Sequence, residues 1–260
     1  EKKRKLVIGE ELDKVRFLHV GSNSHELYDF LVKSIARGGA EMTAILAMNS
    51  SVKTLADTSR WEKFMGKLDT DRFDFVIIAP PVLTFSNSCY EGGPARAGLG
   101  PEIYGLRKLG PEMKDHVKVE NIMWSRAAQL ASALYERDIP WLLMAPAFEG
   151  MATTPSNLEA VDDIISQPNV KPCFVGERAD NGIRKGMAMM LYGFGVDLDK
   201  IAYGAEKKHL QKLCNKVIQA AADHALGHGD GDADRAAPVA ADDASIGAGA
   251  SSFVSVGCDG

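Results

Sequence analysis

The sequence lacks several features that would place a protein in a class at once. Its four cysteines show no Cys-x-x-Cys spacing, which argues against a zinc site and against a disulfide scaffold. No apolar run reaches the roughly 18 to 20 residues that a membrane-spanning helix needs, and no leader-like segment precedes the first predicted strand. Basic residues are not in excess either, because the formal net charge is −5. A global field that attracts nucleic acid is therefore missing, and we expect an intracellular protein, with nucleus and cytoplasm both open.

The length and composition are those of a globular protein. The 260 residues suffice for one large α/β domain. From about Gly227 onward Gly, Asp, Ala and Ser dominate, with almost no apolar periodicity. Such a segment buries too little surface to offset its ordering entropy. We therefore predict an N-terminal extension over 1–14, an α/β domain over 15–226 and a disordered tail over 227–260.

The central feature of the domain is an apolar segment that ends at two prolines. Phe73 to Ile78 is interrupted only by Asp74 and predicts a strand covered on both faces. Proline cannot donate ladder hydrogen bonds, so the strand must end at Pro80-Pro81. Open α/β sheets bind ligands beyond the carboxyl ends of their strands. The polar residues of the following loop are therefore candidate site residues: Thr84, Ser86 and Asn87.

Strand and helix patterns alternate around this segment, which favours an α/β fold with a doubly wound, mostly parallel sheet. The segment 140–146 again ends in proline, and we expect it beside the central strand. The remaining predicted strands are 15–21, 41–48, 170–175 and 186–192. The predicted helices are 25–37, 59–68, 111–137, 158–165 and 206–225.

The first predicted strand ends in a glycine turn followed by a helix, as in nucleotide-binding α/β folds. Only Gly21 is present, because no second glycine occurs in Ser22-Asn-Ser-His25. A dinucleotide-dependent oxidoreductase, which needs Gly-x-Gly-x-x-Gly, is therefore the least favoured alternative. The second strand leads to Asn49, where cofactor-binding sheets commonly carry an acidic residue.

The order of these segments resembles the cytosine-5 DNA methyltransferases, and most of all divergent methyltransferase-like proteins of mobile elements. The likeness covers about 16–186 and is strongest over 73–86, where the family has a strand, Pro-Pro-Cys and then often Thr-Phe-Ser. It implies a Rossmann-like S-adenosylmethionine methyltransferase fold. By the same likeness, the cofactor would be bound by Phe17, Gly21, Ser22, Asn49, Asp57, Pro80 and Pro81.

The residues that carry the family's chemistry are replaced in this chain. In the family a cysteine thiolate adds to the ring of a flipped cytosine and a glutamate contacts the ring nitrogen. The matching positions hold Val82 and Met144. Cys89 lies in the same loop, but nothing near it in sequence would activate a thiolate. The resemblance therefore implies a degenerate domain without cytosine methylation, acting as a pseudoenzyme or binding module.

Two further hypotheses stay open. The segment Ala79-Pro-Pro-Val82 loosely resembles the Asp/Asn-Pro-Pro-aromatic loop of amino-group methyltransferases, so an active enzyme on another acceptor would have to orient it with Thr84, Ser86 or Asn87. Basic residues also flank the loop, where they are candidate phosphate contacts for nucleic acid or else a solvated surface. These residues are Arg96, Arg107 and Lys108.

Overall fold

The computed structural model describes residues 15–21, 30–31, 33–35, 41–44, 56–85, 93–98, 100–146, 153–176, 178–179, 182–183, 189–198 and 207–227. The predicted extension over 1–14 lies outside these residues. So does the predicted tail, except for Gly227, which ends the last helix.

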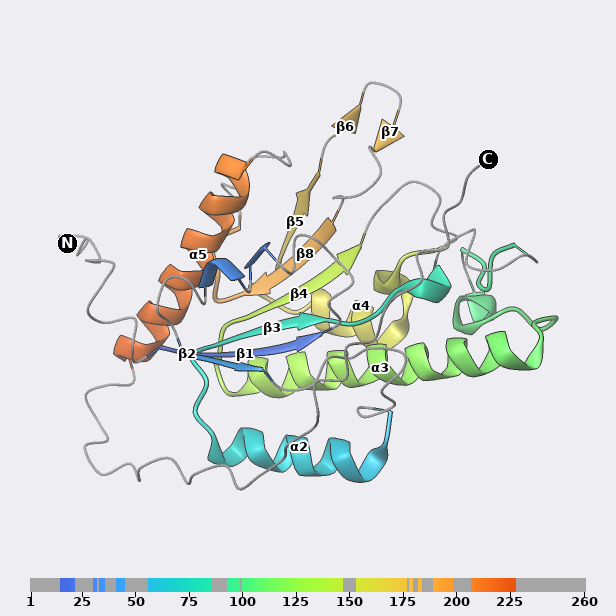
Figure 1. Ribbon diagram of the computed structural model, residues 1–260, viewed down its shortest axis with the longest axis horizontal. Helices are drawn as coiled ribbons and strands as arrows, with labels where there is room; N and C mark the ends of the chain where they lie inside the picture. The colour runs from blue at the N-terminus through green and yellow to red at the C-terminus, as the bar shows by residue number, and fades with distance from the viewer. Residues whose placement is uncertain are drawn as a thin grey trace.

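The domain is built on one mixed six-stranded sheet in the order β2-β1-β3-β4-β8-β5 (Figure 1). Strands β2, β1, β3 and β4 are parallel to one another. Strand β8 pairs antiparallel with both β4 and β5. The strands are β1 (Arg16–Gly21), β2 (Glu41–Ala44), β3 (Phe75–Ala79), β4 (Trp141–Pro146), β5 (Lys171–Val175) and β8 (Met189–Phe194).

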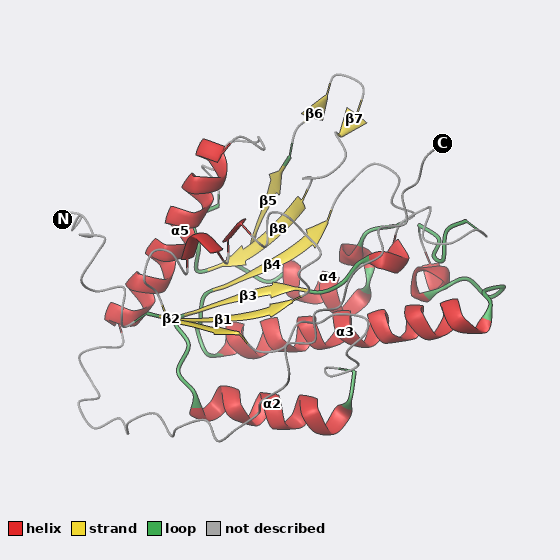
Figure 2. Cartoon of the chain, in the orientation of Figure 1, coloured by secondary structure: helices red, strands yellow, loops and turns green. Residues whose placement is uncertain are grey.

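Helices cover both faces of the sheet (Figure 2). One core joins Val76 and Ile78 of β3 to α2 (Thr58–Thr70), α3 (Pro111–Glu136) and α4 (Glu159–Ile165). The other core joins Phe75 and Ile77 of the same strand to α5 (Lys207–Gly227) and to the helical residues Leu31 and Ile35. Successive side chains of a strand point to opposite faces, so a strand between two helical layers must be apolar throughout. All five residues of β3 are buried.

The element boundaries follow local chemistry closely. Strand β3 ends at Ala79, because Pro80 cannot continue a ladder. Helix α3 begins at Pro111 behind Gly110, and proline is favoured at the first helical position. Helix α2 begins behind Asp57, whose carboxylate accepts from the Arg60 amide at 2.9 Å, which satisfies a free helix-terminal donor. The predicted adjacency of 140–146 to the central strand is confirmed.

The placement of the last strand could not be anticipated. The expected strand 186–192 is observed as Met189–Phe194, and it enters antiparallel between β4 and β5. Two short strands, β6 (Arg178–Ala179) and β7 (Gly182–Ile183), pair with each other outside the main sheet. Among the described helices, none combines the length and apolarity needed to cross a membrane.

Candidate functional site

The ligand-binding position of this sheet topology lies between β1 and β3. The chain runs from β1 outward to β2 and then returns past β1 to β3, so the connections diverge at this point. In open α/β sheets the crevice at such a switch point, outside the carboxyl ends of the strands, receives the ligand. Gly21 and Ala79 are register partners there, and neither projects more than a methyl group.

The loop that leaves β3 is held against α3. The indole Nε1 of Trp124 donates to the Pro81 carbonyl at 2.8 Å. The Phe85 ring meets the same indole edge-on, with ring centroids 6.2 Å apart. A short helical turn, η2 (Leu83–Phe85), forms in between. The backbone after the two prolines therefore has a fixed course, set by a helix more than thirty residues further along the chain.

A buried carboxylate fixes the same loop. Glu120 Oε2 accepts from the Thr84 amide at 3.0 Å and also from the Thr84 hydroxyl. Glu120 is 3% exposed and Thr84 is fully buried. Burial raises the pKa of Glu120 above its ordinary value, while the Thr84 hydrogen bonds and the nearby Arg96 charge oppose that rise. The Thr84 hydroxyl is thus directed into the protein.

Arg96 completes this cluster and is itself buried, with 1% exposure. Its Nε donates to Thr84 Oγ1 at 2.9 Å, and its Nη1 donates to the Ile103 carbonyl at 2.7 Å and to Asn121 Oδ1 at 2.6 Å. The guanidinium also stands over the Phe85 ring, 4.0 Å from its centroid. Arginine has a fork of five donors, which suits a position where several buried acceptors need partners.

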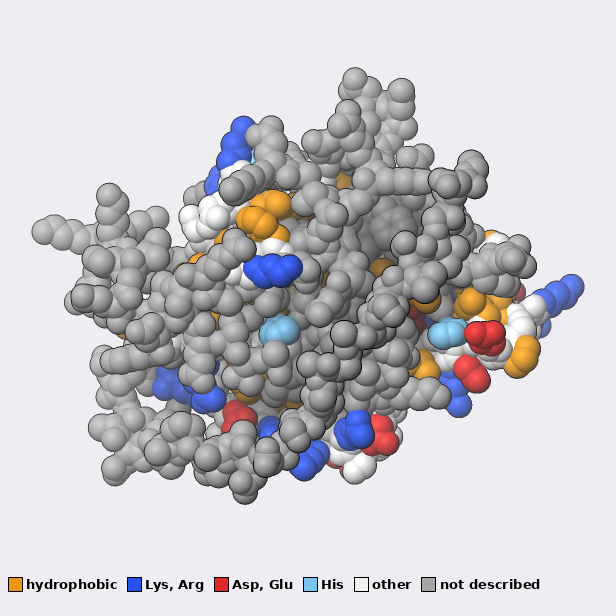
Figure 3. Space-filling view, in the orientation of Figure 1, with side chains coloured by type: hydrophobic (Ala, Val, Ile, Leu, Met, Phe, Trp, Pro, Cys, Tyr) orange, Lys and Arg blue, Asp and Glu red, His pale blue; other side chains and the backbone are white. Residues whose placement is uncertain are grey.

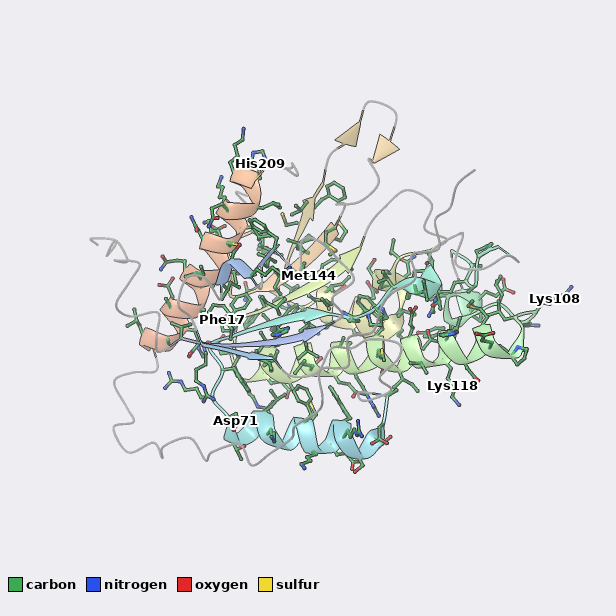
Figure 4. The ribbon with its side chains drawn as sticks, in the orientation of Figure 1. Phe17, Asp71, Lys108, Lys118, Met144 and His209 are labelled. Atoms are coloured by element: carbon green, nitrogen blue, oxygen red, sulfur yellow. The ribbon has the colours of Figure 1, made fainter. Side chains whose placement is uncertain are left out.

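The prediction that Arg96 contacts phosphate is therefore wrong for this conformation. The loop 93–98 turns the side chain inward, where a buried carboxylate and carbonyl groups occupy its donors. Arg107 and Lys108, the other two predicted contacts, are exposed. Figure 4 shows Lys108 at the end of the molecule where α3 begins, far from Phe17 on β1.

The two positions at which the sequence resemblance led us to expect catalytic residues pack on opposite faces of the sheet. Val82 is partly buried and packs against the core on the α3 face. Met144 is fully buried in the other core, which includes residues of α5. Neither isopropyl nor thioether groups supply a nucleophile or exchange a proton.

Of the predicted cofactor contacts, the structure places four near the carboxyl edge of the sheet. Gly21, Pro80 and Pro81 lie at the strand ends, and Asp57 stands at the start of α2 on the same side (Figure 1). Phe17 is a correction: it is fully buried near the start of β1, with its ring 5.9 Å from that of Phe75, so it is a core residue. The predicted contacts Ser22 and Asn49, and the loop residues Ser86 and Asn87, lie outside the described residues.

The described ionisable groups near β1 and α5 add little reactivity. Burial lowers the pKa of the His19 imidazole, which keeps the ring neutral at physiological pH. Burial raises the pKa of the Cys214 thiol to about 11, so this thiol is protonated at physiological pH. Cys173 is also a buried free cysteine. In the part of the chain that the structure describes, no group of three or more His, Cys, Asp or Glu is placed to hold a metal.

The buried network was not anticipated from the sequence, although one signal was available. Glu120 is an acidic residue on a helix face otherwise made of apolar side chains such as Val117 and Met123. A carboxylate in such a position needs a buried partner. What the sequence does not reveal is which partner, because Thr84 and Arg96 reach it only through the tertiary fold.

Comparison of the chain with protein-family models, with curated proteins and with solved structures gave no match in any of the three.

Proposed function

We propose that this chain is a methyltransferase-like domain without cytosine-5 methylation chemistry, which acts by binding. The resemblance of the segment 73–86 to the family motif supports the relationship. The α/β sheet with a switch point between β1 and β3 is compatible with a Rossmann-like S-adenosylmethionine fold. The small residues Gly21 and Ala79 stand at that edge, and Asp57 would accept from the base of a bound nucleoside.

One observation supports the proposed absence of cytosine methylation. After Pro81, the position of the nucleophile holds Val82, and the next hydroxyl, that of Thr84, is buried and bonded to Glu120 and Arg96. A reacting group must be able to approach its substrate within hydrogen-bond or near-attack distance. Among the described residues of this loop, no nucleophile meets that requirement.

The alternative of an active enzyme on an amino group is weakened by the same contact. Thr84 was one of three candidate orienting groups, and its hydroxyl points into the core. Ser86 and Asn87 remain candidates for that hypothesis.

The experiment is a calorimetric titration of the full chain with S-adenosylmethionine and with S-adenosylhomocysteine. It is combined with a cytosine methylation assay of the wild type and of Val82→Cys. We expect no methyl transfer from either protein, because Val82→Cys restores the thiol but leaves Met144 in place of the glutamate. Methylation by the wild type would overturn the proposal. Micromolar cofactor binding without methylation would identify a binding module that retains its cofactor site.

A further inference from the structure

A concave site lies at the amino-terminal end of α3, between its first turns and the segment 104–109 before it. The groove has a volume of about 410 Å³. Its walls are mainly aliphatic, with one tyrosine and two lysines at the rim. The residues that define it are Tyr104, Leu106, Leu109, Lys114, Lys118 and Ile122.

The groove is preformed because hydrogen bonds hold its walls. Asn121 Nδ2 donates to the Tyr104 carbonyl at 2.8 Å, and the Tyr104 hydroxyl accepts from the Glu159 amide of α4 at 3.2 Å. The tyrosine is thus fixed at both ends while 46% of it stays exposed. Gly105 has a φ of 128°, and a Cβ there would lie 2.8 Å from Val117 Cγ1. The backbone of the 104–109 segment therefore packs so closely on α3 that no side chain fits at this position.

The charge of the rim has one sign. Lys114 and Lys118 are exposed and stand one helical turn apart, which places neighbouring side chains on the same helix face. Glu120, two residues further, is turned inward to Thr84 and Arg96. The other carboxylates at this end of α3 lie outside the lining. Figure 3 shows hydrophobic side chains beside Lys and Arg at this end of the molecule, with acidic groups on the adjoining surface.

We propose that this groove binds an acidic peptide segment of a partner protein. An apolar anchor would enter between Leu109 and Ile122, and carboxylates one helical turn apart would meet Lys114 and Lys118. Aliphatic walls with a few placed charges suit side chains of an amphipathic peptide. Single-stranded nucleic acid is bound instead on several aromatic platforms, and this lining offers one ring. The inference stands on the groove and is independent of the methyltransferase resemblance.

The test is a titration of the ¹⁵N-labelled full chain, followed by amide chemical shifts. The probe is a synthetic amphipathic helix of leucine and glutamate whose glutamates lie one turn apart. We expect amide shifts confined to 104–122. The affinity should be at least about tenfold weaker for the double variant Lys114→Glu/Lys118→Glu, because the new rim carboxylates would repel the glutamates of the peptide. The matched control is Lys63→Glu/Lys67→Glu, which reverses two exposed lysines one turn apart on α2 and should leave the affinity unchanged.

Three results would overturn the proposal. A peptide with glutamine in place of glutamate could bind equally well, which would remove charge recognition. Oligothymidylate could shift the same amides at lower concentration than the peptide, which would make the groove a nucleic-acid site. Finally, the probe could leave the 104–122 amides unshifted up to millimolar concentration.

Discussion

A buried carboxylate lies near each end of β3: Asp74 precedes the strand, and Glu120 of α3 binds the loop that follows it. The two carboxylates serve different parts of the fold. At the amino end, Asp74 Oδ2 accepts from the Arg16 amide at 2.9 Å, and Oδ1 faces His224 Nδ1 at 3.4 Å. This carboxylate joins β1, β3 and α5. At the carboxyl end, Glu120 joins the loop after Pro81 to α3 with Arg96 beside it.

The difference lies in what each carboxylate holds in place. Asp74 connects regular elements whose positions the two cores already favour. Glu120 and Arg96 order the loop after β3, where the buried Thr84 amide lies outside the sheet ladder and would otherwise be left without an acceptor. The contacts of Glu120 and Arg96 therefore fix the loop that follows the two prolines and carries Val82. The variants below separate the two ends.

The largest effect is expected from Arg96→Ala. The change leaves the buried Glu120 carboxylate without its cationic partner and removes one hydrogen bond each from Thr84, Ile103 and Asn121. Removing one partner of a buried ion pair costs about 3 to 5 kcal/mol. Urea unfolding monitored by circular dichroism measures it, and the exposed Arg107→Ala, expected within about 0.5 kcal/mol of wild type, is the control. Equal stability of the two variants would contradict burial of Arg96.

Asp74→Ala tests the amino end and should cost less, about 2 to 3 kcal/mol, because it leaves the Arg16 amide without its side-chain acceptor. The neighbouring Asp71→Ala, at the end of α2, serves as the control and should change the free energy of unfolding by no more than about 0.5 kcal/mol. If Asp74→Ala lowered the free energy of unfolding more than Arg96→Ala does, the network of Glu120 and Arg96 would contribute less to stability than the contacts of Asp74.

The pH dependence of stability should distinguish Glu120→Gln from the wild type. The pKa of Glu120 is raised above its ordinary 4.5, so the folded state binds this proton more tightly than the unfolded state. Wild-type stability should therefore rise, relative to the variant, as pH falls through the raised pKa towards 4.5, by about 1.4 kcal/mol per pKa unit. Unfolding free energies over a pH series measure the difference. If the stability of the wild type fell relative to the variant as pH falls, the Arg96 charge would lower the pKa of Glu120 by more than burial raises it.

The smallest effect is expected from Arg72→Ala. Arg72 Nε lies 3.7 Å from Asp74 Oδ1, and its side chain is 31% exposed, so solvent screens the pair. Such pairs contribute about 0.5 kcal/mol, and the variant also removes a hydrogen bond of 3.3 Å to the Ala225 carbonyl. Raising the salt concentration should reduce the gap between variant and wild type in urea unfolding. A loss of stability as large as that of Arg96→Ala would show that the Asp74 contacts at the amino end of β3 also depend on a cationic partner, Arg72.

Local chemistry in the sequence determined most of the elements of this protein. Proline ends β3 and begins α3. Apolar side chains of α3 such as Val117, Met123 and Leu134 lie in the core. These features depend on the backbone and on burial of nearby side chains, which a single stretch of sequence contains.

The tertiary structure alone decided the direction of β8, the burial of Arg96 and the pairing of Thr84 with Glu120. Strand direction depends on where a distant segment can enter the sheet, and Met189–Phe194 carries no local mark of being antiparallel. A loop arginine looks the same in sequence whether it meets solvent or a carboxylate twenty-four residues away. Only the packing of the loop on α3 brings Arg96 and Glu120 together, because the cost of an unpaired buried charge is set by the folded environment.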